Sequence, residues 1–434
     1  MSFAEASAFL EALGIDAMKS MAPSLHRMEA LCKALGHPEQ SLQAIHVTGT
    51  NGKTSTARIA SSIVTATGLN VATYTSPHLE SIRERLVLNG QPISEREFGE
   101  LFAYLHPYLD LVQARLDEEL TFFEVLTGMF FVWAAENADA VVIEVGLGGS
   151  WDATNVIDAQ VAVITNVGLD HTQLLGTDRA SIAEEKSGIV KPSAIAVTGE
   201  RTPEILRLLQ ARCDEVQAQL VPIDRGFHLT ENRIAVGGRY LSVETSCAKY
   251  SDLFLPLHGN HQGVNAAVAL EAVTRFLPVN PPGDDVVTEG FAKTVVPGRL
   301  ETVKLTDAGA RVVMDVAHNP DGMSALVSSL VEAFAFDRAL MVVGILADKD
   351  YLGMLTELKR LPCSLVLTQA ATVRSVSLEA LAEAAQTLGI GCAVVDDVAT
   401  AVKTTLESAV EGELVCITGS HYVVGEARSY LLNR

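Results

Sequence analysis

The sequence lacks paired cysteines, a basic surplus and any long apolar run. Its six cysteines are scattered and form no CxxC pair, which argues against both a zinc site and a disulfide scaffold. The 32 Lys and Arg residues are outnumbered by 53 Asp and Glu residues, and the formal charge of −21 argues against binding to nucleic acids or anionic membranes. Glu124 interrupts the most apolar segment, and no run approaches the roughly 18 apolar residues that span a membrane.

These absences favour a cytoplasmic protein with small-molecule partners. The first residues, Met1 to Ala6, contain neither the basic nor the apolar part of a secretion signal. Apolar residues make up 48% of the 434 residues, which is ample material for packed cores. At roughly 100–200 residues per domain, the length predicts two or three domains. Nothing in the sequence signals an oligomer, and we expect a monomer.

Short β-branched runs alternate with helical patterns, which is typical of βαβ units around a mostly parallel sheet. Helices are predicted at about 54–67, 123–136 and 261–276, and a hairpin at 226–246. A second α/β series begins near residue 297, where we place the domain boundary. The predicted strands are Ala44–Thr48, Val71–Thr75, Ala140–Val145, Val161–Thr165, Ile195–Val197, Val312–Val316, Ala339–Val343, Leu365–Thr368, Cys392–Val395 and Leu414–Thr418. The helix after Pro320 is predicted to bury Met323, Leu326, Val327, Leu330, Val331 and Phe334.

The strongest local signal is the segment from His46 to Ser55, between a predicted strand and a predicted helix. Its glycines let the backbone wrap an anion, and the helix N-terminus offers free N–H groups to phosphate. Lys53 can reach the β- and γ-phosphates, and Thr54 can meet a bound Mg²⁺. The pattern is incomplete, because Val47 stands where a standard phosphate loop has glycine. A tight turn without a ligand is the alternative, but the strand–loop–helix context favours nucleotide binding.

Polar groups also follow other predicted strands at their carboxyl ends. Glu144 ends an apolar strand, where a charge is costly unless it is paired or bound to a metal, and the glycines after it leave room for a ligand. Ser76–Leu79 follows a second strand, and Asp170-His171 follows a third. A lone histidine such as His171 is more often a loop residue than a metal ligand. The convergence of these strand ends nevertheless predicts a nucleotide–Mg²⁺ site, since doubly wound sheets bind ligands there.

Taken together, the motifs resemble the dihydrofolate synthase and folylpolyglutamate synthase family, relatives of the Mur peptide ligases. The ordered set extends over nearly the whole chain, and the set is far more specific than any one motif. Its members are Thr48–Lys53, Thr75–Leu79 with Arg83–Arg85, Thr121–Glu124, Glu144–Gly149, Asp152–Asn155, Thr165–His171, Glu185–Pro192, His258–Gln262 with Asn265–Ala267, Pro297–Glu301, Asp315–Pro320 and Thr418–Ser420.

The resemblance implies a P-loop-type ATPase domain with a mostly parallel sheet and a pterin site, residues 1–296, followed by a smaller Rossmann-like glutamate ligase domain, residues 297–434. It implies an ATP-dependent acid–amino-acid ligase of folate biosynthesis, with dihydrofolate synthase and tetrahydrofolate synthase activity. The carboxylate of 7,8-dihydropteroate or of a reduced folate would take the γ-phosphoryl group, and the amine of L-glutamate would attack the acyl phosphate. Such a transfer needs positioning and charge neutralisation, which Lys53 and Mg²⁺ would supply.

The resemblance also assigns roles residue by residue. Nucleotide binding is implied for Thr50, Asn51, Gly52, Lys53, Thr54, Ser55, Asn265, Arg299 and Asp315. Two Mg²⁺ sites are implied, with Ser76 and Glu144 on the first and His171 on the second. Catalytic roles are implied for Lys53, Lys186, Asp315 and His318, the last near a cleft between the domains. The pterin-side pocket matches Thr121, Phe122, Phe123, Glu124, Trp151, Asp152 and Ala153.

Lys186 enters only through the resemblance, because by itself it looks like a surface lysine with acidic neighbours. Family members carry this lysine as a carbamate, in which CO₂ turns a cation into an anionic oxygen ligand. The sequence leaves K⁺ unaddressed. Phe122, Phe123 or Trp151 could stack on a pterin ring, and we expect core packing for at least one of them. Ser150 departs from the arginine of many members, which bears on the preferred pterin or glutamate tail.

Two alternatives to the bifunctional ligase stay open. The first is a monofunctional folylpolyglutamate synthase or a related amide ligase with a different acceptor, for which Ser150 is the only hint. A peptidoglycan ligase usually carries an extra N-terminal domain, and roughly 40 residues before the first strand are too few for one. The second is a nucleotide-binding switch or motor, which would leave the downstream motifs without a purpose. For the ligase, we expect the two domains to close on each other during turnover.

Overall fold

The computed structural model describes residues 1–14, 24–277, 281–303 and 309–432. The chain forms two compact units. The larger comprises residues 1–231, 241–254 and 264–294, and the smaller comprises residues 232–240, 255–263 and 295–434. The single boundary near residue 297, with its assignment of ATP binding and glutamate ligation to the two sides, stays a prediction.

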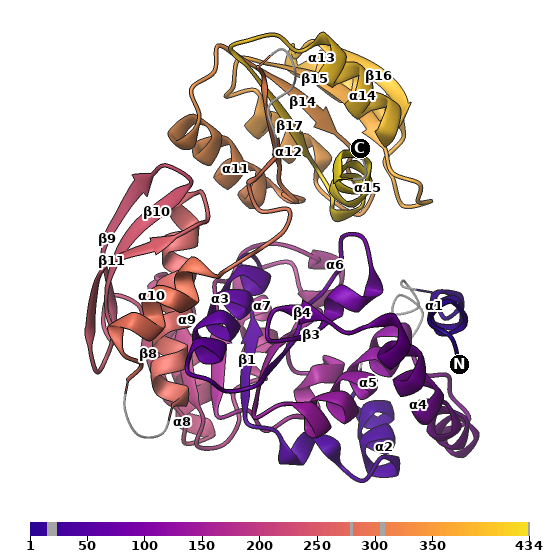
Figure 1. Ribbon diagram of the computed structural model, residues 1–434, viewed down its shortest axis with the longest axis vertical. Coiled ribbons are helices and arrows are strands. Elements are labelled where there is room, and N and C mark those ends of the chain that lie inside the picture. Colours follow the sequence, from indigo (N-terminus) through magenta and orange to yellow (C-terminus); the bar gives the residue numbers. More distant parts are fainter. Residues whose placement is uncertain (15–23, 278–280, 304–308, 433–434) are drawn as a thin grey trace. The chain divides into compact units, whose positions relative to one another are not determined.

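An eight-stranded sheet forms the centre of the larger unit (Figure 1), with strand order β4-β3-β2-β5-β1-β6-β7-β8. The strands from β2 to β8 in this order run parallel, while β3 and β4 form an antiparallel edge. The predicted mostly parallel sheet is therefore confirmed, and β2, β5, β1 and β6 lie side by side. The strands are β1 (Ala44–Thr48), β2 (Val71–Tyr74), β3 (Leu86–Leu88), β4 (Gln91–Pro92), β5 (Ala140–Glu144), β6 (Val161–Ile164), β7 (Ile195–Thr198) and β8 (Gln219–Pro222).

Helices cover this sheet and bury its apolar residues. Helix α5 is apolar on nearly every side because it packs against α2, α4 and β2. On α3, the Ser62 hydroxyl donates to the Gly290 carbonyl at 2.6 Å, which holds α10 closely against it. The helices are α1 (Phe3–Ala12), α2 (His26–Ala34), α3 (Lys53–Ala66), α4 (Glu95–Leu116), α5 (Phe122–Asn137), α6 (Thr172–Leu175), α7 (Arg179–Ser187), α8 (Pro203–Glu215), α9 (Asn260–Phe276) and α10 (Asp284–Ala292), with 3₁₀ turns at Pro38–Ser41, Ile82–Arg85 and Ala153–Val156.

A small three-stranded sheet follows, with the order β11-β10-β9. Strands β9 (His228–Ala235) and β10 (Gly238–Glu244) are neighbours joined by two residues, which only antiparallel strands allow, so the predicted hairpin is confirmed. The third strand, β11 (Lys249–Leu255), carries exposed polar residues and gave no strand pattern in the sequence.

The smaller unit has a six-stranded sheet, β12-β13-β17-β14-β15-β16, parallel except for β12. The predicted second α/β series is confirmed. In α11, the predicted stripe is buried except Val331, which is 61% exposed because it lies at the stripe's edge, about 80° from Met323 at 100° per residue. The elements are β12 (Glu301–Val303), β13 (Arg311–Met314), β14 (Arg338–Val343), β15 (Cys363–Gln369), β16 (Cys392–Asp397), β17 (Glu413–Thr418), α11 (Pro320–Ala333), α12 (Tyr351–Leu358), α13 (Leu378–Leu388), α14 (Val398–Ser408) and α15 (His421–Leu432).

Candidate active site

The phosphate loop joins β1 to α3, and two of its residues must be glycine. Gly49 has φ 150°, and a Cβ there would lie 1.8 Å from the Thr165 hydroxyl oxygen. Gly52 precedes α3 with φ 82°, and a Cβ there would lie 2.5 Å from Oδ1 of Asn265. Val47 lies inside β1, before the turn begins, so the turn needs no glycine at that position.

The loop after β6 holds the phosphate loop in place. The Thr50 N–H donates to the Asn166 carbonyl oxygen at 3.0 Å, and the Gly168 N–H donates to the Thr50 hydroxyl at 2.8 Å. The Asn51 N–H donates to Oδ1 of Asn166 at 3.1 Å, and its carbonyl accepts from the Thr165 hydroxyl at 2.7 Å. The backbone shape of the loop is therefore fixed by its neighbour.

The side chains at the start of α3 point in different directions. The Lys53 ammonium donates to the carbonyl oxygens of Gly49 and Thr50, at 3.0 and 3.1 Å, so the chain folds back over the loop. Thr54 turns toward β5, and Ser55 is buried in the helix's first turn. A helix N-terminus whose N–H groups lack intrahelical partners and which carries a lysine is suited to bind a phosphate chain.

Glu144, at the end of β5, is in contact with the phosphate loop. Its carboxylate is 1% exposed, and its Oε1 accepts a hydrogen bond from the Thr54 hydroxyl at 2.9 Å. Its Oε2 accepts from the Ser76 N–H at 3.2 Å, at the end of neighbouring β2. The end of β5 thus meets the first turn of α3 and the residue that follows β2. The Glu144 carboxylate and the Thr54 hydroxyl are oxygen ligands of the kind that Mg²⁺ prefers, and the Ser76 backbone N–H orients the carboxylate.

Asp170 and His171 follow the loop that holds Thr50. The His171 N–H donates to Oδ1 of Asp170 at 2.8 Å, and its ring Nε2 lies 3.9 Å from the same oxygen. His171 adopts φ 50° at the start of α6, and its side chain is about one-third exposed. Among the described residues, no three or more His, Cys, Asp and Glu side chains are grouped to hold a metal by themselves.

Lys186 is a buried residue, in contrast to its appearance in the sequence. It is 3% exposed near the end of α7. Burial, together with the charge of Lys53, lowers the pKa of its amine to about 7, against the opposing charges of Asp170, Glu185 and Asp152. Lys186 therefore lies close enough to Lys53 and Asp170 for their charges to act on its amine.

The glycines after Glu144 allow close packing within the protein, and the expectation that they leave room for a ligand stays a prediction. A Cβ on Gly146 would lie 2.6 Å from the Phe123 ring, and one on Gly149 would lie 2.7 Å from the Glu185 carbonyl oxygen. The Ser150 hydroxyl donates to that same carbonyl at 2.9 Å. The loop therefore lies directly on the last turn of α7, beside Lys186.

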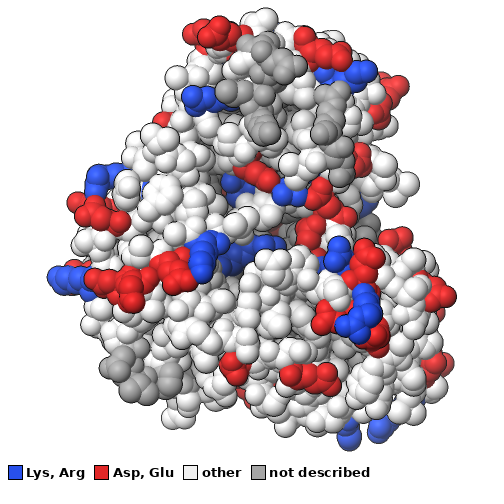
Figure 2. Space-filling model, in the orientation of Figure 1, with Lys and Arg blue, Asp and Glu red and all other residues white. Residues whose placement is uncertain are grey.

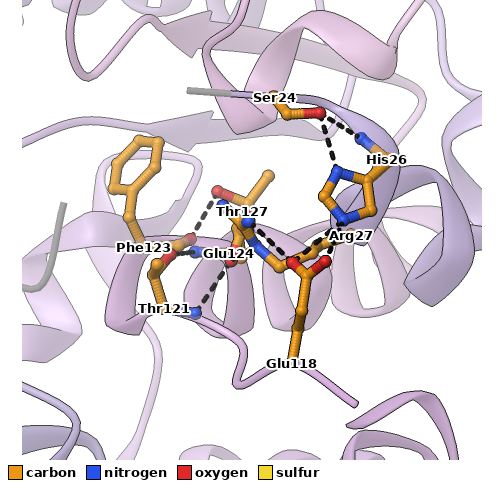
Figure 3. A network of polar contacts seen from close by, with 8 residues as sticks. All are labelled: Ser24, His26, Arg27, Glu118, Thr121, Phe123, Glu124 and Thr127. Carbon is orange, nitrogen blue, oxygen red and sulfur yellow. Dashed lines mark hydrogen bonds and ion pairs between the residues drawn. The ribbon is translucent and has the colours of Figure 1, made fainter. Parts of the chain in front are cut away.

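A polar network surrounds the start of α5, at the predicted pterin side (Figure 3). The Thr121 hydroxyl accepts from the Glu124 N–H at 3.2 Å, and the Thr121 N–H donates to Oε2 of Glu124 at 2.8 Å. The Arg27 Nε–H donates to Glu124 at 3.0 Å, and its NH1 group donates to Glu118 at 3.1 Å. Both side chains of the Arg27–Glu124 pair are 7% exposed. Glu124 and Thr121 thus form a helix cap, stabilised by an arginine from α2.

The other predicted pterin-side residues differ in their surroundings. Phe122 is 3% exposed, with the Arg85 guanidinium 5.2 Å from its ring centre, so core packing holds for this aromatic residue. Phe123 and Trp151 are only partly buried, and they lie against Gly146 and Gly148. Asp152 is 2% exposed and accepts a hydrogen bond from the Leu147 N–H at 3.0 Å, and Ala153 beside it is buried.

In the smaller unit, Asp315 follows β13 and is buried. Its carboxylate accepts from the N–H groups of Leu300 and Ala317, at 3.0 and 2.9 Å. Burial raises the pKa of this carboxyl, while the Arg299 charge opposes the rise. The His318 Nδ1–H donates to the Val316 carbonyl at 2.9 Å, directly before α11. Asp315, Arg299 and His318 therefore gather at the carboxyl end of β13.

The surface agrees with the composition. Acidic side chains are spread over the visible face with basic ones between them (Figure 2), as the charge of −21 leads one to expect. Within the described part of the chain, no helix combines the length and the apolar character needed to cross a membrane.

Comparison with known proteins identifies the family. A model of the Mur ligase middle domain matches residues 47–273, and one of the Mur ligase glutamate ligase domain matches residues 298–421. The dihydrofolate synthase/folylpolyglutamate synthase of Mycobacterium tuberculosis is 37% identical over 440 residues, which cover 94% of this chain and 90% of that protein. Its counterpart in Escherichia coli is 33% identical over 410 residues, again 94% and 90%. The chain belongs to the dihydrofolate synthase/folylpolyglutamate synthase family of Mur ligases.

Solved structures of the family share the fold. Mycobacterium tuberculosis folylpolyglutamate synthase complexed with ADP matches with a TM-score of 0.92 and 36% identity, over 99% of this chain and 98% of that one. Escherichia coli FolC in complex with DHPP and ADP matches with a TM-score of 0.88 and 30% identity, over 100% and 98%. The P-loop-type sheet and the second α/β domain are thus those of the family.

Several residues of the site carry no role in the sequence analysis. Arg27 is isolated in the sequence, and only the fold brings it to Glu124. Glu185 lies inside a family motif, and its Oε1 accepts from the Gly149 N–H at 3.0 Å. His46 opens the phosphate-loop segment and is 0% exposed. Glu185 and His46 could have been identified only because each is a polar residue within a matched or phosphate-loop motif to which no role had been given.

Proposed function

We propose that this chain is an ATP-dependent ligase that joins L-glutamate to 7,8-dihydropteroate and extends folyl(poly)glutamate by way of an acyl phosphate. Membership of the family and the names of its relatives support both activities. The single observation that carries the proposal is the 2.9 Å hydrogen bond from Thr54 to Glu144, because it joins a phosphate loop to a buried carboxylate.

ATP would bind with its phosphates on the N–H groups at the start of α3. Lys53 would exchange its two carbonyl partners for β- and γ-phosphate oxygens. The oxygen atoms of Thr54, Ser76 and Glu144 fit a Mg²⁺ ion, which keeps several ligands for phosphate and water. Mg²⁺ bound there would neutralise charge on the transferring phosphoryl group. We assign His171 to the second ion.

The reaction then has two steps: the substrate carboxylate is activated by phosphorylation, and the activated carboxyl group reacts with glutamate. An oxygen of the substrate carboxylate attacks the γ-phosphorus, the bond to ADP breaks, and a mixed anhydride forms. The neutral amine of glutamate attacks the carbonyl carbon, phosphate leaves with the bonding electrons, and the amine loses its proton. Preorganised charge and positioning supply the rate, because phosphoryl transfer asks for little covalent help.

Lys186 would act as a carbamate. Its pKa of about 7 leaves a large fraction of neutral amine at physiological pH, and a neutral amine is the form that adds CO₂. The carbamate would replace a buried cation by an anion beside the cations of the site. Glu185, Gly149 and Ser150 hold the end of α7, which keeps this side chain directed.

The second domain would complete the site. We assign Arg299 and Asp315, together with Asn265 of α9, to the nucleotide, and His318 to the transferring phosphate or the incoming glutamate. Turnover then requires the domains to close. Cross-linking them in an open state should abolish ligation while ATP binding persists, and surviving ligation would contradict the closure.

The pterin ring would lie at the α5 end of the site. Phe123 and Trp151 are the aromatic residues left for stacking, since Phe122 is buried beneath Arg85. Thr121, Glu124, Asp152 and Ala153 would shape the pocket with their backbone and caps.

The test is ADP release by the purified protein with ATP, Mg²⁺, L-glutamate and 7,8-dihydropteroate, repeated with a reduced folate. Release that depends on both substrates is expected in each case. Turnover with the folate alone would leave a monofunctional folylpolyglutamate synthase. Hydrolysis indifferent to either carboxylate would indicate a nucleotide switch or motor instead.

A further inference from the structure

Three buried polar side chains form a chain of hydrogen bonds beneath the site. His46 of β1 and Thr154 are both 0% exposed, and Asp152 is 2% exposed. The His46 Nε2 lies 2.8 Å from the Thr154 hydroxyl oxygen. That hydroxyl in turn is hydrogen-bonded to Oδ1 of Asp152, which also accepts the Thr154 N–H at 3.0 Å. His46 and Thr154 are 108 positions apart in the sequence.

The direction of these bonds follows from elementary chemistry. An ionised carboxylate only accepts hydrogen bonds, so the Thr154 hydroxyl donates to Asp152 and accepts from the His46 Nε2–H. Burial lowers the pKa of His46 to about 3, so its ring stays neutral and keeps this one proton. Its Nδ1 is buried without a hydrogen-bond partner among the described residues, which an unprotonated nitrogen tolerates better than an N–H.

Asp152 in turn holds the loop that follows Glu144. Its Oδ2 accepts the Leu147 N–H at 3.0 Å, across the turn that contains the packed glycines. Three residues after Asp152, the Asn155 amide donates to the carbonyl oxygens of Ser150 and Gly188, at 2.9 and 3.2 Å. The segment from Asp152 to Asn155 therefore ties the loop to the end of α7, and His46 anchors this segment to the strand that leads into the phosphate loop.

We propose that His46 and Thr154 are positioning residues of the pterin-side pocket, which act through Asp152 to fix the loop that carries Trp151 and Ala153. The inference rests on the function proposed above. Among the described residues, the side chains of His46 and Thr154 are hydrogen-bonded to each other and to Asp152 and not to the phosphate loop. Both should therefore affect binding of the pterin substrate and have little effect on binding of the nucleotide.

The energetic reason lies in the Asp152 carboxylate. Burial raises its pKa to about 6, and the Thr154 hydroxyl together with backbone N–H groups opposes that rise. Removing the hydroxyl takes one donor from a buried charge and one acceptor from the His46 N–H. The loop can then relieve both losses only by moving, which shifts the residues on either side of Asp152.

The test compares Thr154→Val with Thr154→Ser in steady-state kinetics. Thr154→Val should raise the KM for 7,8-dihydropteroate about tenfold, the size that loss of a hydrogen bond to a charged group has, with the KM for ATP nearly unchanged. Thr154→Ser keeps the hydroxyl and should restore the wild-type KM. The control is Thr274→Val, because that buried hydroxyl donates only to the Leu270 carbonyl of its own helix, at 2.8 Å.

A second pair keeps the test decisive if Thr154→Val fails to fold. His46→Gln preserves a side-chain N–H at the Nε2 position and should retain the pterin KM, whereas His46→Leu should raise it. Equal changes in the KM values of ATP and pterin, or a pterin KM unchanged in Thr154→Val and His46→Leu, would overturn the proposal. Absence of dihydropteroate turnover in the wild type would instead refute the proposed function itself.

Discussion

The Thr54 hydroxyl donates a hydrogen bond to the Glu144 carboxylate across 2.9 Å, which joins the first turn of α3 to the end of β5. The two residues stand 90 positions apart, and β1 and β5 are adjacent parallel strands in register. Protein groups thus orient both oxygens of the carboxylate, since the Ser76 N–H donates to the second one. In the proposed function, this hydrogen bond connects the nucleotide site to the Mg²⁺ site.

Glu144→Gln should abolish most Mg²⁺-dependent turnover, by about a hundredfold or more, because a neutral amide is a poor Mg²⁺ ligand. The fold should survive, since the amide oxygen can still accept the Thr54 bond and only the Ser76 N–H loses its acceptor. The measurement is ATP turnover against Mg²⁺ concentration. An unchanged Mg²⁺ dependence in a folded variant would remove Glu144 from the metal site.

Gly49→Ala should weaken ATP binding at least about tenfold, since a Cβ 1.8 Å from the Thr165 hydroxyl forces the loop to move. Gly237→Ala is the matched control, because Gly237 has φ 80° and a Cβ there meets nothing within 4 Å. The control variant should lose only about 1–2 kcal/mol of unfolding free energy, because alanine is strained at this positive φ. Calorimetric titration with a non-hydrolysable ATP analogue distinguishes the two, and equal affinities would contradict the packing argument.

Lys186 should make the stability of the protein depend on pH. Its folded-state pKa of about 7 lies below the usual 10.5, so the unfolded chain binds more protons between these values. The free energy of unfolding contributed by this group therefore rises with pH from about 7 to 10.5 and is flat below. Lys186→Met lacks the titrating amine. In denaturant unfolding in CO₂-free buffer, the unfolding free energy of the wild type should rise relative to that of Lys186→Met as pH rises. The same pH dependence of unfolding free energy in both proteins would refute a buried amine.

The same lysine offers a test of the carbamate. Lys186→Ala should lose ligation, and short carboxylic acids added to the buffer should restore part of it by replacing the carbamate oxygen atoms. The measurement is product formation against acetate concentration, with chloride at equal ionic strength as the control. Failure of any acid to rescue a folded variant would argue that the lysine acts as an amine.

The Arg27–Glu124 pair should stabilise the start of α5. Arg27→Met leaves a buried carboxylate without its partner and should cost about 3–5 kcal/mol of unfolding free energy. The double variant Arg27→Met/Glu124→Gln should recover part of this loss. Arg96→Met is the control, because Arg96 pairs with Glu100 on an exposed helix face. Additive single effects in the double-mutant cycle would show that the pair is not coupled.

Much of the fold could be predicted because its signals are local. Strands β1, β5 and β6 are short β-branched runs, and their burial on both faces makes those runs continuous. Strands such as β11 escaped prediction, since Lys249–Leu255 alternates irregularly between exposed and buried residues. Val331 was wrongly placed in the core, because the pattern does not define how wide a buried stripe is.

Site residues that belong to a sequence motif could be predicted, whereas residues whose role depends on tertiary packing could not. Glycine spacing and Lys53 indicate the phosphate loop, and Glu144 stands out as a charge in an apolar run. The roles of Arg27, His46 and Thr154 arise from partners that are 97 and 108 positions distant in the chain. The close packing of Gly146 against Phe123 and of Gly149 against α7 could likewise be seen only once the chain is folded.

The most direct measurement of the central claim follows oxygen from the substrate carboxylate. 7,8-Dihydropteroate labelled with ¹⁸O in its carboxylate is incubated with the protein, ATP, Mg²⁺ and L-glutamate, and the released phosphate is analysed by mass spectrometry. An acyl phosphate transfers one labelled oxygen to each phosphate formed with product. Phosphate without label, alongside formation of the amide, would contradict the account.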